Sequence, residues 1–333
     1  MSIFEDNKVK LCEKYYLDDV CLNLTYRNDR IAKDISYLIE ALGFDFKESN
    51  SPRIEAHVEF KSAKNRFKKP THLNPIYTSG SISIFLESEQ LYLTDGKSLL
   101  EVDLVRKSGC VSIHDSFWDK KFYSQASLLI MLLIMLFWQY NVHELHGAAL
   151  VKNGKGLLII GPSGSGKSTI AMSLIKSGWS YLTDDMILLY KNGTYIKALP
   201  LRKYFKIDQE VVKKYPELSQ IAKTPLGVLK NKAFLNLHEV YNHRVSNHCI
   251  PKTIIFPKIS YEGQSYLTPM KKSEAFVSLL TNNCYGMFFE NKIIKERTSI
   301  MNALLSQADS YRLSIGLDLY KEPSMIKQIL PNF

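Results

Sequence analysis

Cysteine is scarce in this sequence, and its spacing carries no chemistry. The five cysteines are odd in number, and none stands in a C-x-x-C pair or at a metal-ligand spacing from a histidine. A disulfide scaffold and a zinc site of the usual spacings are therefore excluded. We predict reduced and mostly buried thiols.

Long apolar runs are also missing. The longest, Ala126–Trp138, is apolar on all sides but is shorter than the roughly 20 residues that a helix needs to cross a bilayer. We predict a buried core helix there and no membrane span, with a membrane role as the alternative. The first residues contain acids and no apolar centre of the signal-peptide type, so the predicted location is the cytoplasm.

Acidic residues are fewer than basic ones. Asp and Glu number 33 against 43 Lys and Arg, which gives a net charge of +10 over 333 residues. This mild surplus suits a protein that handles polyanionic nucleotides or an acidic partner at least as well as one that binds nucleic acid. We expect no nucleic-acid partner.

Length and composition predict an ordinary globular protein with two domains, or with one domain and a large elaboration. Hydrophobic residues make up 45% and charged residues 23% of the chain, and its length exceeds the usual size of a single core. No internal repeat or low-complexity linker divides the sequence.

The first 140 residues predict a β-rich domain. Residues 16–26 and 54–60 have strand patterns, residues 34–42 repeat at helical spacing, and short β-like runs over 81–105 indicate a β-meander. The run Lys61–Lys69 packs five cations into nine residues. We interpret it as a solvated loop, with a docking site as the alternative.

One later stretch has the pattern of a phosphate loop. Residues 161–168 fit G-x-x-x-x-G-K-[ST], in which glycines let backbone N–H groups turn inward around an anion. An apolar run, 156–160, leads in, and a helix-compatible run, Thr169–Lys176, leads out to Gly178 at the helix-stop position. The helix N-terminus would therefore point at the phosphates of a nucleotide. The predicted nucleotide-binding residues are Gly161, Ser163, Gly164, Ser165, Gly166, Lys167, Ser168 and Thr169.

Two Asn-Gly turns bracket this loop. The pairs at 153–154 and 192–193 each separate two apolar runs and favour hairpins, the second one between Met186–Tyr190 and Thr194–Ala198. Hairpins place antiparallel neighbours beside the strand that leads into the loop. The sequence therefore predicts a mixed sheet.

An acidic pair, Asp184-Asp185, follows one helix after the loop. It comes after the short run Ser180–Thr183 and precedes the next predicted strand instead of ending one. In most parallel-sheet NTPases the metal-binding Asp caps a distant strand, so this order indicates a different lineage. A turn or a cap is the alternative role of the pair.

These residues supply the parts of a kinase site. Lys167 would neutralise the β- and γ-phosphates, the Ser168 hydroxyl would hold Mg²⁺, and one more carboxylate is needed beside the metal. A kinase also needs an acceptor for the proton of the attacking hydroxyl, which a second carboxylate can supply.

Together the motifs resemble the catalytic core of the HPr kinase/phosphorylase family, whose framework also occurs in phosphoenolpyruvate carboxykinases. The clearest similarity spans residues 143–190, with weaker similarity through 251–280 and 311–318. The motifs that carry it are His146-Gly147, the phosphate loop, residues 174–178 and Asp184-Asp185.

The resemblance implies a role for each polar motif. Asp185 matches the base that takes the proton of the acceptor hydroxyl, and Asp184 matches the metal partner. His146 stands at the family's HG position, where it could orient groups or accept a proton near the phosphates. A structural histidine is the alternative for His146.

The segment Leu199–Asp208 departs from the family. It lacks the R-G-x-G signature and its Glu, which removes the expected second metal carboxylate, and Asp208 is a poorly matched substitute. HPr itself and phosphorolysis are therefore not predicted. The sequence is more similar to HPr-kinase-related proteins, some of which phosphorylate a serine of ribosomally made peptides.

Two cations within this segment have alternative roles. Arg202 and Lys203 follow the second predicted hairpin, where they could clamp a transferring phosphate or an acidic substrate. A solvated surface is the alternative for both.

We predict an α/β (α+β) protein with two domains. Residues 1–140 form a β-rich accessory or substrate-docking domain, and residues 141–333 form an ATP-binding catalytic domain with the mixed-sheet phosphate-loop core of HPr kinase and phosphoenolpyruvate carboxykinase. The expected reaction is ATP- and Mg²⁺-dependent transfer of the γ-phosphoryl group to a hydroxyl, with a serine of a peptide or protein as the expected acceptor. The alternatives are a small-molecule kinase on the same core and a non-catalytic ATP-sensing regulator, and homo-oligomerisation stays open.

Overall fold

The chain divides into two compact units, Met1–Tyr140 and Asn141–Phe333, which are described separately. The computed structural model describes residues 11–46, 52–67, 73–120, 122–202, 204–212, 215–218, 228–229, 232–241, 244–260, 263–282, 291–331 and 333.

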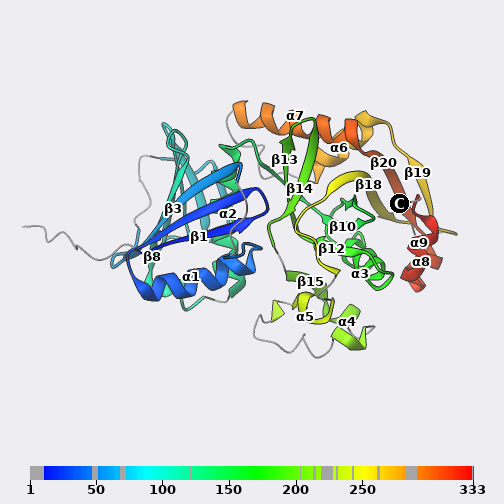
Figure 1. The fold of residues 1–333 in the computed structure, drawn as a ribbon, viewed down its shortest axis with the longest axis horizontal. Coiled ribbons are helices and arrows are strands. Elements are labelled where there is room, and N and C mark those ends of the chain that lie inside the picture. Colours follow the sequence, from blue (N-terminus) through cyan, green and yellow to red (C-terminus); the bar gives the residue numbers. More distant parts are fainter. Residues whose placement is uncertain are drawn as a thin grey trace, which may run out of the picture. The chain divides into compact units, whose positions relative to one another are not determined.

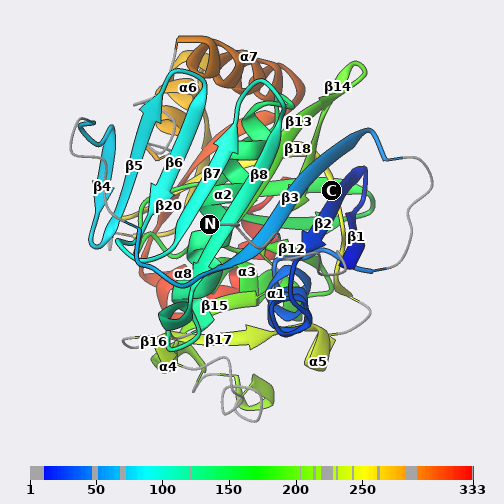
Figure 2. The same cartoon turned by 90° about the vertical axis from the view of Figure 1, so that its left-hand side faces the viewer.

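The first unit is built on one large sheet. Its described strands follow the order β1-β2-β3-β8-β7-β6-β5-β4, seen nearly face-on in Figure 2. The pairs β2–β3 and β3–β8 are parallel, whereas β5 to β8 run antiparallel in sequence order, which confirms the predicted meander. The strands are β1 (Leu11–Leu17), β2 (Val20–Tyr26), β3 (Ile54–Ala63), β4 (Tyr77–Ser79), β5 (Ile82–Glu87), β6 (Gln90–Thr94), β7 (Leu99–Asp103) and β8 (Ser108–His114).

The predicted strand over residues 16–26 is wrong in one respect. The chain turns between β1 and β2, and Asp18 takes a left-handed φ of 52° there. Because Asp tolerates this conformation better than most residues, the two acids after Leu17 make a tight hairpin instead of continuing the strand.

Two helices belong to this unit, α1 (Asp29–Ala41) and α2 (Phe122–Trp138). In α2 nearly every side chain from Ala126 onward is buried, and Leu132 packs at Gly109 of β8. The predicted core helix is therefore confirmed. Among the described residues, no helix is both long enough and apolar enough to cross a membrane.

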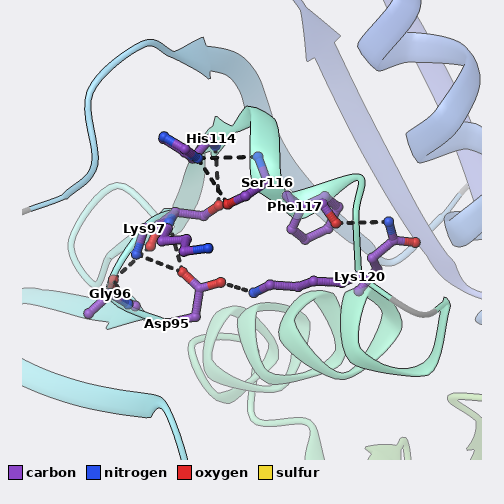
Figure 3. A network of polar contacts seen from close by, with 10 residues as sticks. Asp95, Gly96, Lys97, His114, Ser116, Phe117 and Lys120 are labelled. Carbon is purple, nitrogen blue, oxygen red and sulfur yellow. Dashed lines mark hydrogen bonds and ion pairs between the residues drawn. The ribbon is translucent and has the colours of Figure 1, made fainter.

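A polar clasp joins the β6–β7 turn to the segment before α2 (Figure 3). The Asp95 carboxylate accepts the backbone N–H groups of Lys97 and Ser98 and pairs with the Lys120 ammonium. Desolvation lowers the pKa of Lys120. The clasp fixes a turn and a helix entrance, so we assign it a structural role.

The second unit contains a mixed sheet, as predicted. Its described strands follow the order β12-β10-β11-β18-β20-β19, with β11–β18 and β18–β20 parallel and the other pairs antiparallel. They are β10 (Ala148–Lys152), β11 (Lys155–Ile159), β12 (Ser180–Thr183), β18 (Ile250–Ile259), β19 (Tyr266–Pro269) and β20 (Asp309–Ile315).

Smaller sheets and helices complete this unit. One sheet has the order β14-β13-β9, and another has the order β15-β17-β16. Their strands are β9 (His143–His146), β13 (Met186–Asn192), β14 (Tyr195–Pro200), β15 (Tyr204–Asp208), β16 (Val228–Leu229) and β17 (Lys232–Asn236). The helices are α3 (Lys167–Lys176), α4 (Gln209–Val212), α5 (His238–Tyr241), α6 (Lys272–Thr281), α7 (Asn291–Gln307), α8 (Leu317–Lys321) and α9 (Ile326–Ile329), with 3-10 turns at Pro216–Leu218 and Pro323–Met325.

The two faces of the mixed sheet carry different cores. On one face Leu157 and Ile159 of β11 pack in a cluster with α3. On the other face Leu158 packs in a cluster with β9, β13, β14, α6 and α7. Figure 1 shows α3 on one side of these strands and α6 and α7 on the other.

Both Asn-Gly hairpins form, but the second one turns one residue later than predicted. β10 and β11 meet across Asn153-Gly154, with φ of 51° and 76°. β13 runs on to Asn192, which pairs with Tyr195, so the turn residues are 193–194. Only Gly193 has a positive φ there, as a type II′ turn requires. The hairpin also lies outside the six-stranded order, in the sheet with β9.

Candidate active site

The predicted phosphate loop connects β11 to α3. Gly164 and Gly166 take φ of 84° and 91°, which residues with a side chain rarely adopt. A Cβ on Gly161 would stand 2.8 Å from the Ser165 Oγ atom. Backbone conformation or close packing therefore requires glycine at each of these three positions. The N-terminus of α3 follows the loop directly.

The loop holds two buried polar side chains. The Lys167 ammonium donates to the backbone carbonyls of Gly161 and Pro162, at 2.7 and 2.9 Å. The buried Ser165 Oγ atom has no hydrogen-bond partner among the described residues. A buried polar atom without a partner costs free energy, so this hydroxyl favours a polar ligand in the loop.

Asp184 lies at the carboxyl end of β12. The prediction that the acidic pair does not end a strand is thus wrong, because the short run before it forms the edge strand of the mixed sheet. Its carboxylate accepts the Tyr181 hydroxyl at 3.1 Å and the Lys206 N–H at 2.8 Å. Burial, helped by the charge of Asp185, raises the pKa of Asp184 to about 7.

Asp185 contacts two basic side chains. Its carboxylate pairs with the buried Arg202 guanidinium and lies 3.2 Å from the Nδ1 atom of His146. Burial alone would raise the pKa of Asp185, but Arg202 and His146 outweigh it and hold that pKa well below its usual range. At neutral pH the Asp185 carboxyl group is therefore ionised, whereas the Asp184 carboxyl group is protonated in part of the molecules.

Gly147 places this acidic pair beside the phosphate loop. Its N–H donates to the Asp185 carbonyl at 3.1 Å, and a Cβ on Gly147 would stand 2.8 Å from the Ile159 carbonyl and collide with Ile160. Because the loop begins directly after Ile160, only a glycine after His146 lets the two segments meet. The His146-Gly147 pair thus has a packing reason as well as a chemical one.

The structure resolves the open alternatives for Arg202. The side chain is buried against Asp185, so the solvated-surface alternative is wrong for this residue. The register of the β13–β14 hairpin explains this position. Ile187 pairs with Pro200, which places residue 202 opposite residue 185. The turn predicted from sequence, at 192–193, would give a different register. The contact between residues 185 and 202 could therefore not be predicted. Lys203 lies outside the described residues, as do Lys68 and Lys69 of the predicted basic run.

The fit of a magnesium ion rests on oxygen donors at this site. Mg²⁺ binds through one or two carboxylates together with substrate phosphates and water. The half-buried Ser168 hydroxyl lies in the first turn of α3, and each Asp184 oxygen keeps one lone pair beyond its hydrogen bond. These groups fit the ion. Among the described residues, no group of three or more His, Cys, Asp or Glu side chains could hold a metal without a substrate.

We expect a pH dependence of stability from Asp184. Its folded pKa of about 7 lies above the ordinary value of 3.8, so the folded protein keeps a proton that the unfolded chain releases. The free energy of unfolding should therefore fall as pH rises from about 4 to about 7, by at most ~1.4 kcal/mol per pH unit. Asp185 adds nothing in this window, because its lowered pKa makes its contribution disappear only in stronger acid.

Urea unfolding at several pH values tests this expectation. Asp184→Asn cannot ionise, so the variant should show a flatter dependence between about pH 4 and pH 7 than the wild type. Identical slopes for the two proteins would rule out a raised pKa at Asp184.

The family comparison covers this same region. The model of the HPr Serine kinase C-terminal domain matches residues 140–199, which include the phosphate loop, His146, Asp184 and Asp185. This part of the chain is HPr kinase-like.

Individual HPr kinases match over short stretches. The HPr kinase/phosphorylase of Mycoplasma pneumoniae is 33% identical over 97 residues, which are 29% of this chain and 27% of that protein. The one of Clostridium botulinum strain Eklund 17B is 44% identical over 58 residues, 17% of this chain and 19% of that protein. The match thus spans less than a third of the length of these curated relatives.

A solved structure of the Hpr(Ser) kinase/phosphatase from Coxiella burnetii also aligns, over 56% of this chain and 95% of that one. Its sequence identity of 12% and TM-score of 0.31 are too low to establish a shared fold.

Proposed function

We propose that this protein is an ATP- and Mg²⁺-dependent kinase that transfers the γ-phosphoryl group to a hydroxyl, with a serine of a peptide or protein as the acceptor. One observation carries the proposal: the Gly147 contacts bring the ionised Asp185 to the start of a loop shaped for phosphate. The similarity of residues 140–199 to the HPr kinase domain supports the same reaction class.

ATP would be held by the phosphate loop. Backbone N–H groups of residues 161–169 and the N-terminus of α3 would surround the phosphates. The Ser165 hydroxyl would gain the partner that it lacks within the described protein. The Lys167 ammonium would exchange its contacts with the Gly161 and Pro162 carbonyls for the β- and γ-phosphates.

Ser168 and Asp184 would hold Mg²⁺. When bound, the ion supplies neutralisation of phosphate charge and a fixed orientation of the phosphates. Deprotonation of Asp184 would accompany its coordination, because its pKa of about 7 leaves part of the carboxyl groups protonated at neutral pH.

Asp185 would accept the proton of the acceptor hydroxyl. The hydroxyl oxygen forms a bond to the γ-phosphorus, the bond from that phosphorus to the β–γ bridging oxygen breaks, and ADP leaves with its electron pair. Arg202 and His146 lower the basicity of Asp185. A move of Arg202 toward the γ-phosphoryl group would strengthen this base and stabilise the transferring charge in the same step.

The remaining assignments follow from this reaction. The first unit, with its large sheet, would serve as an accessory or acceptor-docking domain. We place the reaction in the cytoplasm, in keeping with the free state of the four cysteines that the described residues contain.

Lys167→Ala tests the nucleotide part of the proposal. The variant should lose most of the thermal stabilisation that Mg·ATP gives the wild type, because Lys167 is the loop's own cation for the β- and γ-phosphates. Lys176→Ala is the matched control, since this exposed lysine ends the same helix and pairs with Glu217. An equal ligand-induced shift in Lys167→Ala and wild type would remove Lys167 from the site.

A further inference from the structure

Two exposed cations lie on one face of the mixed sheet beside the phosphate loop. In the paired register Phe256, Arg312 and Thr268 form one row, and Lys258, Ser314 and Tyr266 form the next. Cross-strand partners share a face, so Lys258 and Arg312 are diagonal neighbours with a Cα separation of about 7–8 Å. Both side chains are exposed.

The opposite face of these strands is filled, whereas this face is open at its carboxyl end. Ile255, Leu313 and Ile315 point into the cluster around α3. On the cation face, Ile254 and Phe256 are covered in the cluster with α6 and α7. Beyond that cover, Tyr266 is 58% exposed, so the helices leave the last row open to a ligand.

Two further lysines lie at the start of α6, toward the amino end of β20 and away from the phosphate-loop edge. Met270 donates its N–H to the Ser310 carbonyl, and the next residues, Lys271 and Lys272, form the N-cap and first residue of the helix. Both are exposed, and the N-cap has no side-chain hydrogen bond. Cations are unfavourable at a helix N-terminus, where an anion is stabilised.

We name these four residues the basic shelf: Lys258, Lys271, Lys272 and Arg312. Among the described residues no ion pair neutralises any of them. Lys258 and Arg312 repel each other, as do Lys271 and Lys272, and an anionic segment that spans the shelf would relieve both repulsions.

One end of the basic shelf, at Lys258, flanks the phosphate loop. β11, β18 and β20 are parallel, so their carboxyl ends meet at one edge of the sheet. The loop follows β11, and Lys258 follows Pro257, which lies 3.6 Å from the position of a Gly161 Cβ. The shelf shares the sheet face whose core includes β9 and β13, the strands that flank the His146–Asp185 pair. A molecule on the shelf could therefore present a hydroxyl to the same edge.

We propose that the basic shelf binds an extended acidic segment of the phosphoryl acceptor and so selects acidic peptides as substrates; this inference rests on the proposed kinase function. A peptide is favoured over a nucleic acid because the shelf ends at the edge strand β19, where an added strand can pair with backbone groups. Tyr266 is also the single exposed aromatic residue in the two rows, because Phe256 is buried, whereas single-stranded nucleic acids use a series of stacking aromatics.

Peptide binding without nucleotide tests the inference on the full chain. The probes are fluorescein-labelled peptides of equal length with one serine, flanked by glutamates, glutamines or lysines, and binding is followed by fluorescence anisotropy. The glutamate peptide should bind best, and its affinity should fall with added salt. Lys258→Glu/Arg312→Glu should weaken its binding about tenfold or more.

The matched control is Lys155→Glu/Lys191→Glu. It makes the same change in net charge at exposed lysines away from the shelf, at the turn ends of β11 and β13. This control should bind the glutamate peptide like the wild type. Circular dichroism of both variants checks that the fold is kept.

Three results would overturn the inference: no preference for the glutamate peptide, an equal loss in the control variant, or an RNA oligonucleotide of equal charge that binds the shelf as tightly. The kinase proposal is tested independently of the shelf. Lys167→Ala should bind the glutamate peptide normally, so peptide binding can be measured even if nucleotide binding or transfer is lost. Nucleotide binding can likewise be measured if the peptide does not bind.

Discussion

Asp185→Asn should reduce phosphoryl transfer by roughly 10²–10⁴-fold while Mg·ATP binding is retained. The amide keeps the shape of the side chain but cannot take the proton of the acceptor hydroxyl. It also loses the charge that pairs with Arg202, so the guanidinium becomes available to the phosphates. We therefore expect a lower kcat with unchanged or tighter nucleotide binding.

Rates and thermal shifts for matched variants separate the base from its neighbours. Asp184→Asn should raise the Mg²⁺ concentration needed for activity. Asp309→Asn changes an exposed carboxylate at the amino end of β20 and should change neither quantity. Transfer by Asp185→Asn at the wild-type rate would show that another group accepts the proton.

Arg297→Met should destabilise the protein by about 3–5 kcal/mol. The Arg297 guanidinium donates to the Glu144 carboxylate at 2.7 Å and to the Glu144 carbonyl at 3.3 Å, and both residues are buried. Without Arg297 the carboxylate stays buried with its main partner removed. This contact ties α7 to β9, the strand that ends at His146, so the loss should also reach the candidate site.

Replacing both partners tests the cause of that loss. Glu144→Leu/Arg297→Met removes both charges, and such apolar replacements of buried pairs are often neutral or stabilising. The double variant should therefore regain most of the stability in chemical denaturation followed by circular dichroism. If it is as unstable as Arg297→Met alone, the effect comes from lost packing and not from an uncompensated charge.

The buried pair between Glu144 and Arg297 also affects His143. Burial, together with the nearby Arg297 charge, lowers the pKa of His143 to about 4. Neither partner of the pair could be identified from sequence, since 153 residues separate them and each lies in an element with ordinary charge patterning.

Local patterns predicted the parts of the fold that depend on few residues. The Asn-Gly turn at 153–154 needs two positive φ angles, which Asn and Gly adopt readily, so the β10–β11 hairpin follows from sequence. The apolar helix over 126–138 follows from its composition. At 192–193 the same dipeptide gave a wrong turn position, because Asn192 pairs with Tyr195 as the last residue of β13 and Gly193 is the first turn residue.

The candidate site was predictable in identity but not in geometry. Its motifs named Lys167, Asp184, Asp185 and His146, and their proposed roles stay predictions. The burial of Arg202 against Asp185 depends on a register that a one-residue shift of the turn changes. The raised pKa of Asp184 depends on its burial beside Tyr181, which no local pattern encodes.

Transfer of label from ATP is the most direct test of the central proposal. The full chain is incubated with γ-labelled ATP, Mg²⁺ and the serine peptide flanked by glutamates, and the product is analysed for phosphoserine. We expect labelled phosphoserine from the wild type, essentially none from Lys167→Ala, and about 10²–10⁴-fold less from Asp185→Asn. ATP that binds and stays intact, or label released only as inorganic phosphate in the presence of this peptide and of the cell's own peptides, would contradict it.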